Sequence, residues 1–138
     1  MKSKPKHRAN RYESITVAEH LKRMEPHLRS IVREARRAVR QAAPMAREQP
    51  YQSKPPRAKS SLWKIARYVV GDADVVGIAL SSVHAVLYFY RGAELDDGSG
   101  LLDGGGKSMR FIRLTTPRDA LRPEVRRMLQ RAFSAAVQ

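Results

Sequence analysis

The chain has 138 residues and no cysteine, which excludes a disulfide framework and any metal site built on thiolates. Its 27 Lys and Arg residues outnumber its 13 Asp and Glu residues and give a formal net charge of +14, which attracts polyanions in general without selecting one. No run approaches the roughly 20 apolar residues of a membrane span, and the basic start lacks the apolar stretch of a secretory signal. We therefore expect a cytoplasmic protein that does not bind membranes.

Residues 1–13 are basic and lack apolar periodicity, which predicts a disordered tail ahead of one folded domain over 14–138. Thr16 and Glu19 form a capping-box pattern, which predicts a helix over 16–24. Pro26 suits the first position of a second helix over 26–43. That helix has one apolar stripe, made by Leu28, Ile31, Val32, Ala35, Val39 and Ala42, and its arginines lie away from the stripe.

The next segment, 44–61, is rich in proline and poor in apolar residues, which predicts a long irregular loop. Short runs rich in β-branched and aromatic residues then predict strands over 64–70, 75–80, 84–90 and 108–114. The short connections between the first three favour an antiparallel meander. A last helix is predicted over 123–136. This order predicts an α+β fold in which the N- and C-terminal helices pack on one face of the sheet.

The stretch Gly100–Arg110, "GLLDGGGKSMR", raises the question of a phosphate-binding P-loop. A P-loop needs a glycine five positions before its Gly-Lys-Ser, but Leu101 stands there relative to Gly106. The motif must also open a helix, whose N-terminus stabilises the phosphates. The residues after Lys107 have the composition of a strand, so the sequence excludes a P-loop.

The longer stretch "LYFYRGAELDDGSGLLDGGGKSMRFIRL", residues 87–114, resembles the signature of the YdhG-like domains, a largely uncharacterised bacterial family. Asp103 stands where the family usually has Glu, and Phe111 where His is common. The resemblance spans about residues 16–136 and implies a sandwich similar to frataxin. The matching residues are Phe89, Gly92, Ala93, Glu94, Leu95, Gly100, Leu101, Leu102, Gly104, Gly106, Lys107, Met109 and Arg110.

Some YdhG-like proteins are regarded as iron chaperones, so the resemblance raises metal handling as one function. Iron delivery needs clustered oxygen ligands. The carboxylates that could supply them are Glu94, Asp96, Asp97 and Asp103, all in residues 92–110, which we call the signature loop. The alternative is that they form turns and balance Lys107 and Arg110.

The sequence contains no recognisable set of catalytic residues. No Gly-x-Ser-x-Gly elbow joins a strand to a helix. The four histidines, His7, His20, His27 and His84, fit structural or solvated roles better than a base or ligand role. We therefore predict a non-enzymatic protein without a cofactor.

Strand alternation divides the predicted sheet into two faces. If the helices cover Leu87, Phe89, Ile112 and Leu114, the open face carries Tyr88, Tyr90, Met109, Phe111 and Arg113. Such an aromatic and basic sheet is a surface on which single-strand binders stack bases. The alternative is that the segment 45–61 or a second subunit covers it. Trp63, although surrounded by basic residues, is expected to be a core anchor.

Three functional hypotheses remain. The first is a domain that binds an unidentified small ligand or protein partner, as a monomer or a homodimer. Its site would combine the cations Lys107 and Arg110, held by Gly104 and Gly106, with open-face residues. These open-face residues are Tyr88, Tyr90 and Phe111. The second is nonspecific nucleic-acid binding through the basic residues Lys54, Arg57, Lys59, Lys64, Arg67 and Arg113. The third is metal handling by the acidic loop.

Overall fold

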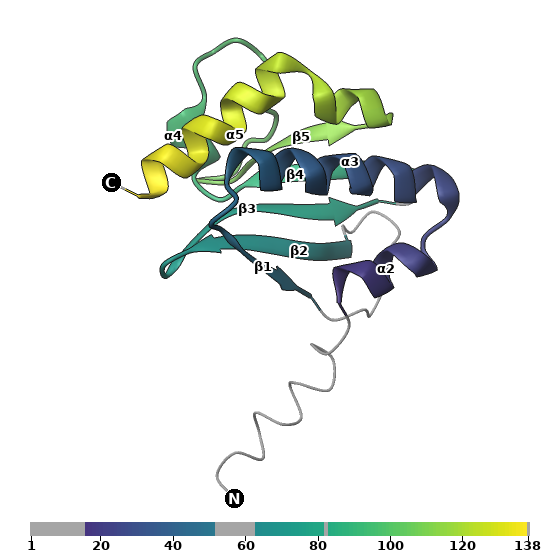
Figure 1. The fold of residues 1–138 in the computed structure, drawn as a ribbon. Helices are drawn as coiled ribbons and strands as arrows, with labels where there is room; N and C mark the ends of the chain where they lie inside the picture. The colour runs from purple at the N-terminus through teal and green to yellow at the C-terminus, as the bar shows by residue number, and fades with distance from the viewer. Residues whose placement is uncertain (1–15, 52–62, 82, 138) are drawn as a thin grey trace, which may run out of the picture.

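The computed structural model describes residues 16–51, 63–81 and 83–137 (Figure 1). These residues form a five-stranded antiparallel sheet with the order β1-β2-β3-β4-β5. The strands are β1 (Arg47–Pro50), β2 (Trp63–Val70), β3 (Ala73–Leu80), β4 (Ala85–Phe89) and β5 (Arg110–Leu114). The helices are α2 (Val17–Arg23), α3 (Pro26–Ala42), α4 (Gly92–Leu95) and α5 (Pro123–Ala136), with a 3₁₀ turn η1 (Pro117–Leu121). The predicted α+β fold is confirmed.

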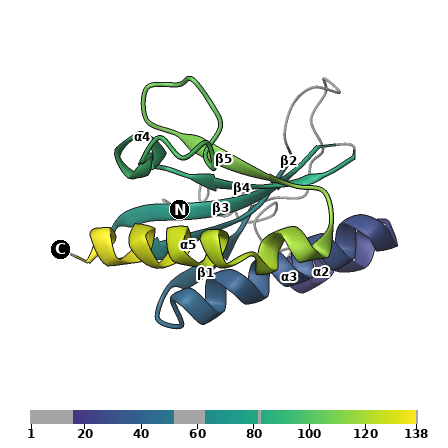
Figure 2. The same ribbon diagram turned by 90° about the horizontal axis from the view of Figure 1, so that it is seen from above.

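Figure 2 shows α3 and α5 on one side of the sheet, and the segment between α4 and β5 rising on the other. The predicted packing of the long helices on a single face is therefore confirmed. The four sheet residues that we expected beneath them are all buried, namely Leu87, Phe89, Ile112 and Leu114. Burial of such side chains contributes about 1.5–3 kcal/mol each, which makes this layer the main source of stability.

The two N-terminal helices begin where the sequence indicates. Thr16 caps α2 as predicted: its hydroxyl accepts a hydrogen bond from the Glu19 amide at 3.1 Å, and the Glu19 carboxylate accepts one from the Thr16 amide at 3.0 Å. Pro26 occupies the first turn of α3. The middle of its apolar stripe is buried, and the end members Leu28 and Ala42 are partly buried. Across the described residues, the helices all fall short of the length and apolar character that a bilayer crossing demands.

The C-terminal helix has the bounds that we predicted, and its stripe of Val125, Met128, Leu129, Ala132 and Phe133 is buried. It is joined to β5 through η1. The carboxylate of Asp119 accepts hydrogen bonds from the amides of Thr115 at 2.7 Å and Thr116 at 3.0 Å. Burial of this carboxyl favours its neutral form, but these hydrogen bonds outweigh that effect and lower the pKa of Asp119.

One prediction about the sheet is wrong. The segment 44–61, expected to be an irregular loop, contains β1, which pairs with β2 in the register Arg47↔Val69 to Pro50↔Ala66. The strand "REQP" lacks the alternating apolar residues that mark a half-buried strand, so its pattern gave no signal. Polar contacts hold it instead, chiefly those of Glu48 with α3 and β2.

The triple-glycine segment behaves as a bend that leads into a strand. Lys107 precedes β5 and begins no helix, which confirms that this is not a P-loop. Gly104 has φ of +119°, a conformation that a side chain strongly disfavours. Just before it, Asp103 pairs with Phe111 by two backbone hydrogen bonds of 2.8 and 2.9 Å.

Candidate functional site

The sheet face turned away from α3 and α5, here called the open face, has its own small cluster of buried side chains. Strand register places Gln49, Arg67, Gly77, Tyr88 and Phe111 in one row across all five strands. The neighbouring row contains Lys64, Ala79, Val86 and Arg113. The buried members Ala79, Val86 and Tyr88 form a cluster separate from the core beneath the helices.

Tyr88 lies at the centre of the open face and is only 2% exposed. Its ring lies over Gly77 on the adjacent strand, so closely that an added Cβ would be 2.2 Å from Tyr88 Cζ. The Tyr90 ring lies 5.4 Å away, tilted by 59°. The hydroxyls of Tyr90 and Tyr51 are hydrogen-bonded at 3.1 Å. The prediction that Tyr88 is an exposed contact residue is therefore wrong, because a glycine opposite lets the ring settle onto the sheet.

Two cations lie against these tyrosines. Lys64 Nζ is 5.7 Å from the Tyr51 ring centroid and 5.6 Å from that of Tyr88. Arg67 Cζ is 5.4 Å from the Tyr51 centroid, and its Nε donates to Gln49 Oε1 at 2.9 Å. These are distances at which a ring face attracts a cation. The rings therefore hold both charges at defined positions on the open face.

The hydroxyls of Tyr88 and Tyr90 stay protonated over the whole physiological range. Burial raises the pKa of Tyr88, and the neighbouring Tyr90 raises it further. Burial also raises the pKa of Tyr90, together with its hydrogen bond to Tyr51. The Tyr88 hydroxyl has no hydrogen-bond partner among the residues that the structure describes.

A second aromatic–cation pair extends the open face towards β5. Arg113 Cζ lies 5.8 Å from the Phe111 centroid, and Arg113 Nε donates to His84 Nε2 at 3.1 Å. Burial lowers the pKa of His84, and the charge of Arg113 lowers it further. His84 is thus kept neutral as an acceptor, in the structural role that the sequence analysis assigned to it.

The structure brings together only part of the predicted ligand site. Tyr88, Tyr90 and Phe111 share the open face. The predicted anion-facing role of Arg110 is not what the structure shows, because its guanidinium donates to the carbonyls of Gly106 at 2.6 Å and Met109 at 2.8 Å. It closes its own loop. Lys107 is exposed in that loop, near Gly104 and Gly106.

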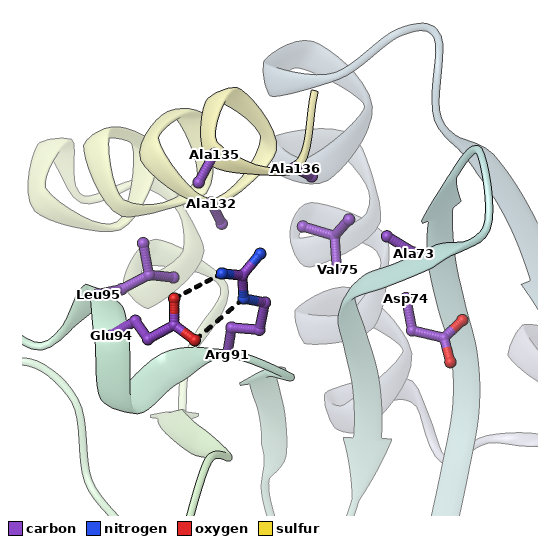
Figure 3. A pocket seen from close by; sticks show the side chains of 9 residues that line it. All are labelled: Ala73, Asp74, Val75, Arg91, Glu94, Leu95, Ala132, Ala135 and Ala136. Carbon is purple, nitrogen blue, oxygen red and sulfur yellow. Dashed lines mark hydrogen bonds and ion pairs between the residues drawn. The ribbon is translucent and has the colours of Figure 1, made fainter. Parts of the chain in front are cut away.

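A cavity beside the signature loop avoids Lys107 and Arg110. It measures about 160 Å³ and lies where α4, α5 and the start of β3 meet (Figure 3). Its walls are mostly apolar. Figure 3 shows the Arg91 guanidinium entering it while bound to Glu94, at 3.1 and 2.6 Å. The loop therefore contributes Arg91, Glu94 and Leu95 to a hollow, instead of the predicted cations.

Three of the four acidic residues of the loop have a local partner for their carboxylate. Glu94 pairs with Arg91, whose hydrogen bond lowers the pKa of Glu94. Asp96 accepts from the Gly98 amide at 2.9 Å, and Asp97 from the Ser99 amide at 3.0 Å. Asp103 is held through its backbone. Within residues 16–51, 63–81 and 83–137, the structure gathers no group of three or more side chains able to hold a metal ion.

Only half of the residues predicted to bind nucleic acid can be placed. Lys64, Arg67 and Arg113 lie on the open face, whereas Lys54, Arg57 and Lys59 lie outside the described residues. Trp63 packs against the core beneath the helices, as predicted. Sequence reasoning left Tyr51 out of the site because it follows β1, the strand that the pattern did not reveal.

Comparison of the chain with protein-family models, with curated proteins and with solved structures finds no match.

Proposed function

We propose that this protein is a non-enzymatic binding domain of the YdhG-like type that takes an anionic ligand on the open face of its sheet. The family assignment is supported by the 87–114 pattern and by an antiparallel sheet backed by helices on one face. The observation that carries the binding role is the pair of cations, Lys64 and Arg67, held against tyrosine rings on a sheet face that the helices leave open.

The charges of this face favour an anion. Lys64 is exposed, and Arg67 has one carboxylate nearby, Asp74, with an N–O separation of 3.8 Å. A guanidinium presents five N–H donors, so Arg67 keeps donors for a ligand after its bond to Gln49. The half-buried rings of Tyr51 and Tyr90 add apolar surface, and one of their two paired hydroxyls keeps its proton to donate. Together these groups suit a ligand that combines negative charge with a planar or apolar part.

The signature loop supports this face without contributing its charges. Asp103 pairs with Phe111, and Arg110 closes the loop onto its own carbonyls, so β5 is held in register beside Tyr88. We infer a positioning role for Gly104, Gly106, Arg110 and the buried Tyr88, and a binding role for Lys64, Arg67, Tyr90 and Phe111.

Isothermal titration calorimetry with ATP, pyrophosphate and adenosine tests the proposal. We expect ATP and pyrophosphate to bind and adenosine not to bind, because the charge provides most of the attraction. The double variant Lys64→Ala/Arg67→Ala should weaken ATP binding at least tenfold, since a loss of about 1.4 kcal/mol of binding free energy is tenfold in affinity. Shifts of backbone amide resonances on ATP addition should concentrate in β2 and β3.

The matched control removes the same charge from the other side of the molecule. Arg126→Ala/Arg127→Ala, on α5, should leave the ATP affinity within about twofold, because exposed charges beyond about 10 Å are largely screened at 0.1 M salt. Equal weakening in the two double variants would contradict the proposal, as would the lack of binding by both ATP and pyrophosphate.

A further inference from the structure

On the helix side of the sheet, α3 carries an open groove lined by four arginines. Its lining residues are Arg33, Arg36, Arg37, Arg40 and Gln41, and its volume is about 350 Å³. These residues recur at three- and four-residue spacings, so they share the face of α3 that is turned away from its buried stripe. We call this feature the arginine groove.

One carboxylate beneath the groove fixes two of its arginines. Glu48 accepts two hydrogen bonds from Arg36, at Nε and NH2, each of 2.8 Å. It accepts a third from Arg40 at 3.1 Å and a fourth from the Tyr68 hydroxyl at 2.6 Å. The Glu48 side chain is 11% exposed, whereas that of Arg40 is 53% exposed. The carboxylate is thus enclosed, while guanidinium donors of both arginines remain at the surface.

The other two arginines are less engaged. Arg37 makes one contact with Glu34, at 3.4 Å. Arg33 has no side-chain hydrogen bond or ion pair with any residue in the described part of the chain, and it is exposed. The groove therefore combines four positive charges with two negative ones, Glu34 and Glu48. Arg33, and Arg37 with its single 3.4 Å contact, are the members that keep most of their donors for an external anion.

The length of the groove decides what kind of anion fits it. At a rise of 1.5 Å per residue, Arg33 and Arg40 are separated by about 10 Å along the helix axis. One strand of duplex DNA presents a phosphate about every 3.4 Å of its axis, so about three phosphates fall within that length. Guanidinium groups bind phosphate oxygens in a planar, two-pronged geometry.

We propose that the arginine groove binds the phosphate backbone of double-stranded nucleic acid, without reading its sequence. The occupant follows from charge complementarity: an extended row of phosphates matches a row of arginines, in a chain whose net charge is +14. Acidic peptides carry charges that are less regularly spaced on a more flexible backbone. Tighter binding of such a peptide is therefore the competing outcome of the test. The surface differs from the open face, on the other side of the sheet, and its occupancy does not depend on the proposed function.

Fluorescence anisotropy with a 20-base-pair duplex of arbitrary sequence tests this inference on the full chain. If about three phosphates are neutralised, the slope of log affinity against log salt is about −2.7, and affinity falls about 40-fold between 50 and 200 mM salt. Two duplexes of unrelated sequence should bind within about twofold of each other. In Arg33→Ala/Arg37→Ala the slope should become shallower by about 2, and affinity at 50 mM salt should fall at least tenfold.

A matched variant separates a local groove from general basicity. Arg126→Ala/Arg127→Ala, on α5, also removes two charges and should leave the slope unchanged. An equal decrease in the α3 and α5 variants would overturn the inference, as would tighter binding of a glutamate 20-mer than of the duplex. Alanine favours helix, so the α3 variant should keep its circular dichroism spectrum. Should it unfold, Arg33→Gln/Arg37→Gln provides the same readout.

Discussion

Replacement of Gly77 by alanine should lower the free energy of unfolding by about 3 kcal/mol, at the upper end of what one added methyl group costs in a packed interior. The new Cβ would lie 2.2 Å from Tyr88 Cζ and 2.3 Å from its hydroxyl oxygen. Tyr88 is 2% exposed and in contact with Ala79 and Val86, so its ring cannot move without disturbing the open-face cluster. Denaturation by urea, followed by circular dichroism, measures the loss.

A double-mutant cycle identifies Tyr88 as the cause. In a Tyr88→Ala background the added methyl group meets no ring, so Gly77→Ala should cost at least 1 kcal/mol less there than in the parent. Gly105→Ala is the matched control, because nothing lies within 4 Å of its added Cβ and its φ is not positive. It should change stability by no more than about 0.5 kcal/mol. Additive effects of the Gly77 and Tyr88 substitutions would show that the close approach does not determine stability.

Glu48→Gln should destabilise the fold by about 2 kcal/mol at pH 7, the typical worth of hydrogen bonds to a charged group. The substitution removes the charge that Arg36 and Arg40 share but keeps an oxygen to accept the Tyr68 hydroxyl. Because these contacts join α3 to β1 and β2, the loss should appear as global destabilisation. Asp72→Asn removes a charge from an exposed turn and serves as the control, with an expected change below about 0.5 kcal/mol.

The same carboxylate predicts a dependence on pH. Burial of Glu48 favours its neutral form, but the hydrogen bonds from Arg36 and Tyr68 outweigh that effect, so its pKa in the folded protein is lowered. Its contribution is therefore complete above the pKa of the unfolded chain and is lost as pH falls through the lower folded value. Between pH 6 and pH 3, urea denaturation should show the difference between parent and Glu48→Gln shrinking. A difference that stays constant over that range would refute this assignment.

Much of the fold follows from local patterns in the sequence. The apolar stripes of α3 and α5, the capping box at Thr16 and the β-rich runs near Lys64, Val75 and His84 depend on neighbours within a few residues, and each led to the correct element. Strand β1 was missed because its stability comes from Glu48, whose partners Arg36 and Tyr68 lie 12 and 20 residues away in sequence. No local periodicity records such contacts.

The binding face was predicted in outline and corrected in detail. Alternation placed Tyr88, Tyr90 and Phe111 on one face, but it does not reveal how deep a ring settles, because that depends on Gly77 in the neighbouring strand. Likewise, the sequence shows that Arg110 follows a glycine-rich loop. Only the folded loop shows that Arg110 satisfies carbonyls of that loop in preference to facing outward.

The pairing of Asp103 with Phe111 has a consequence for self-association. β5 is an outer strand, and unpaired backbone groups on an outer strand can template fibril growth by strands of other molecules. By occupying the Phe111 amide and carbonyl, the chain's own loop denies part of that template to neighbours. At the opposite border, β1 spans only four residues and ends in Pro50, which lacks an amide hydrogen to offer. Both borders of the sheet thus discourage ordered aggregation in a crowded solution.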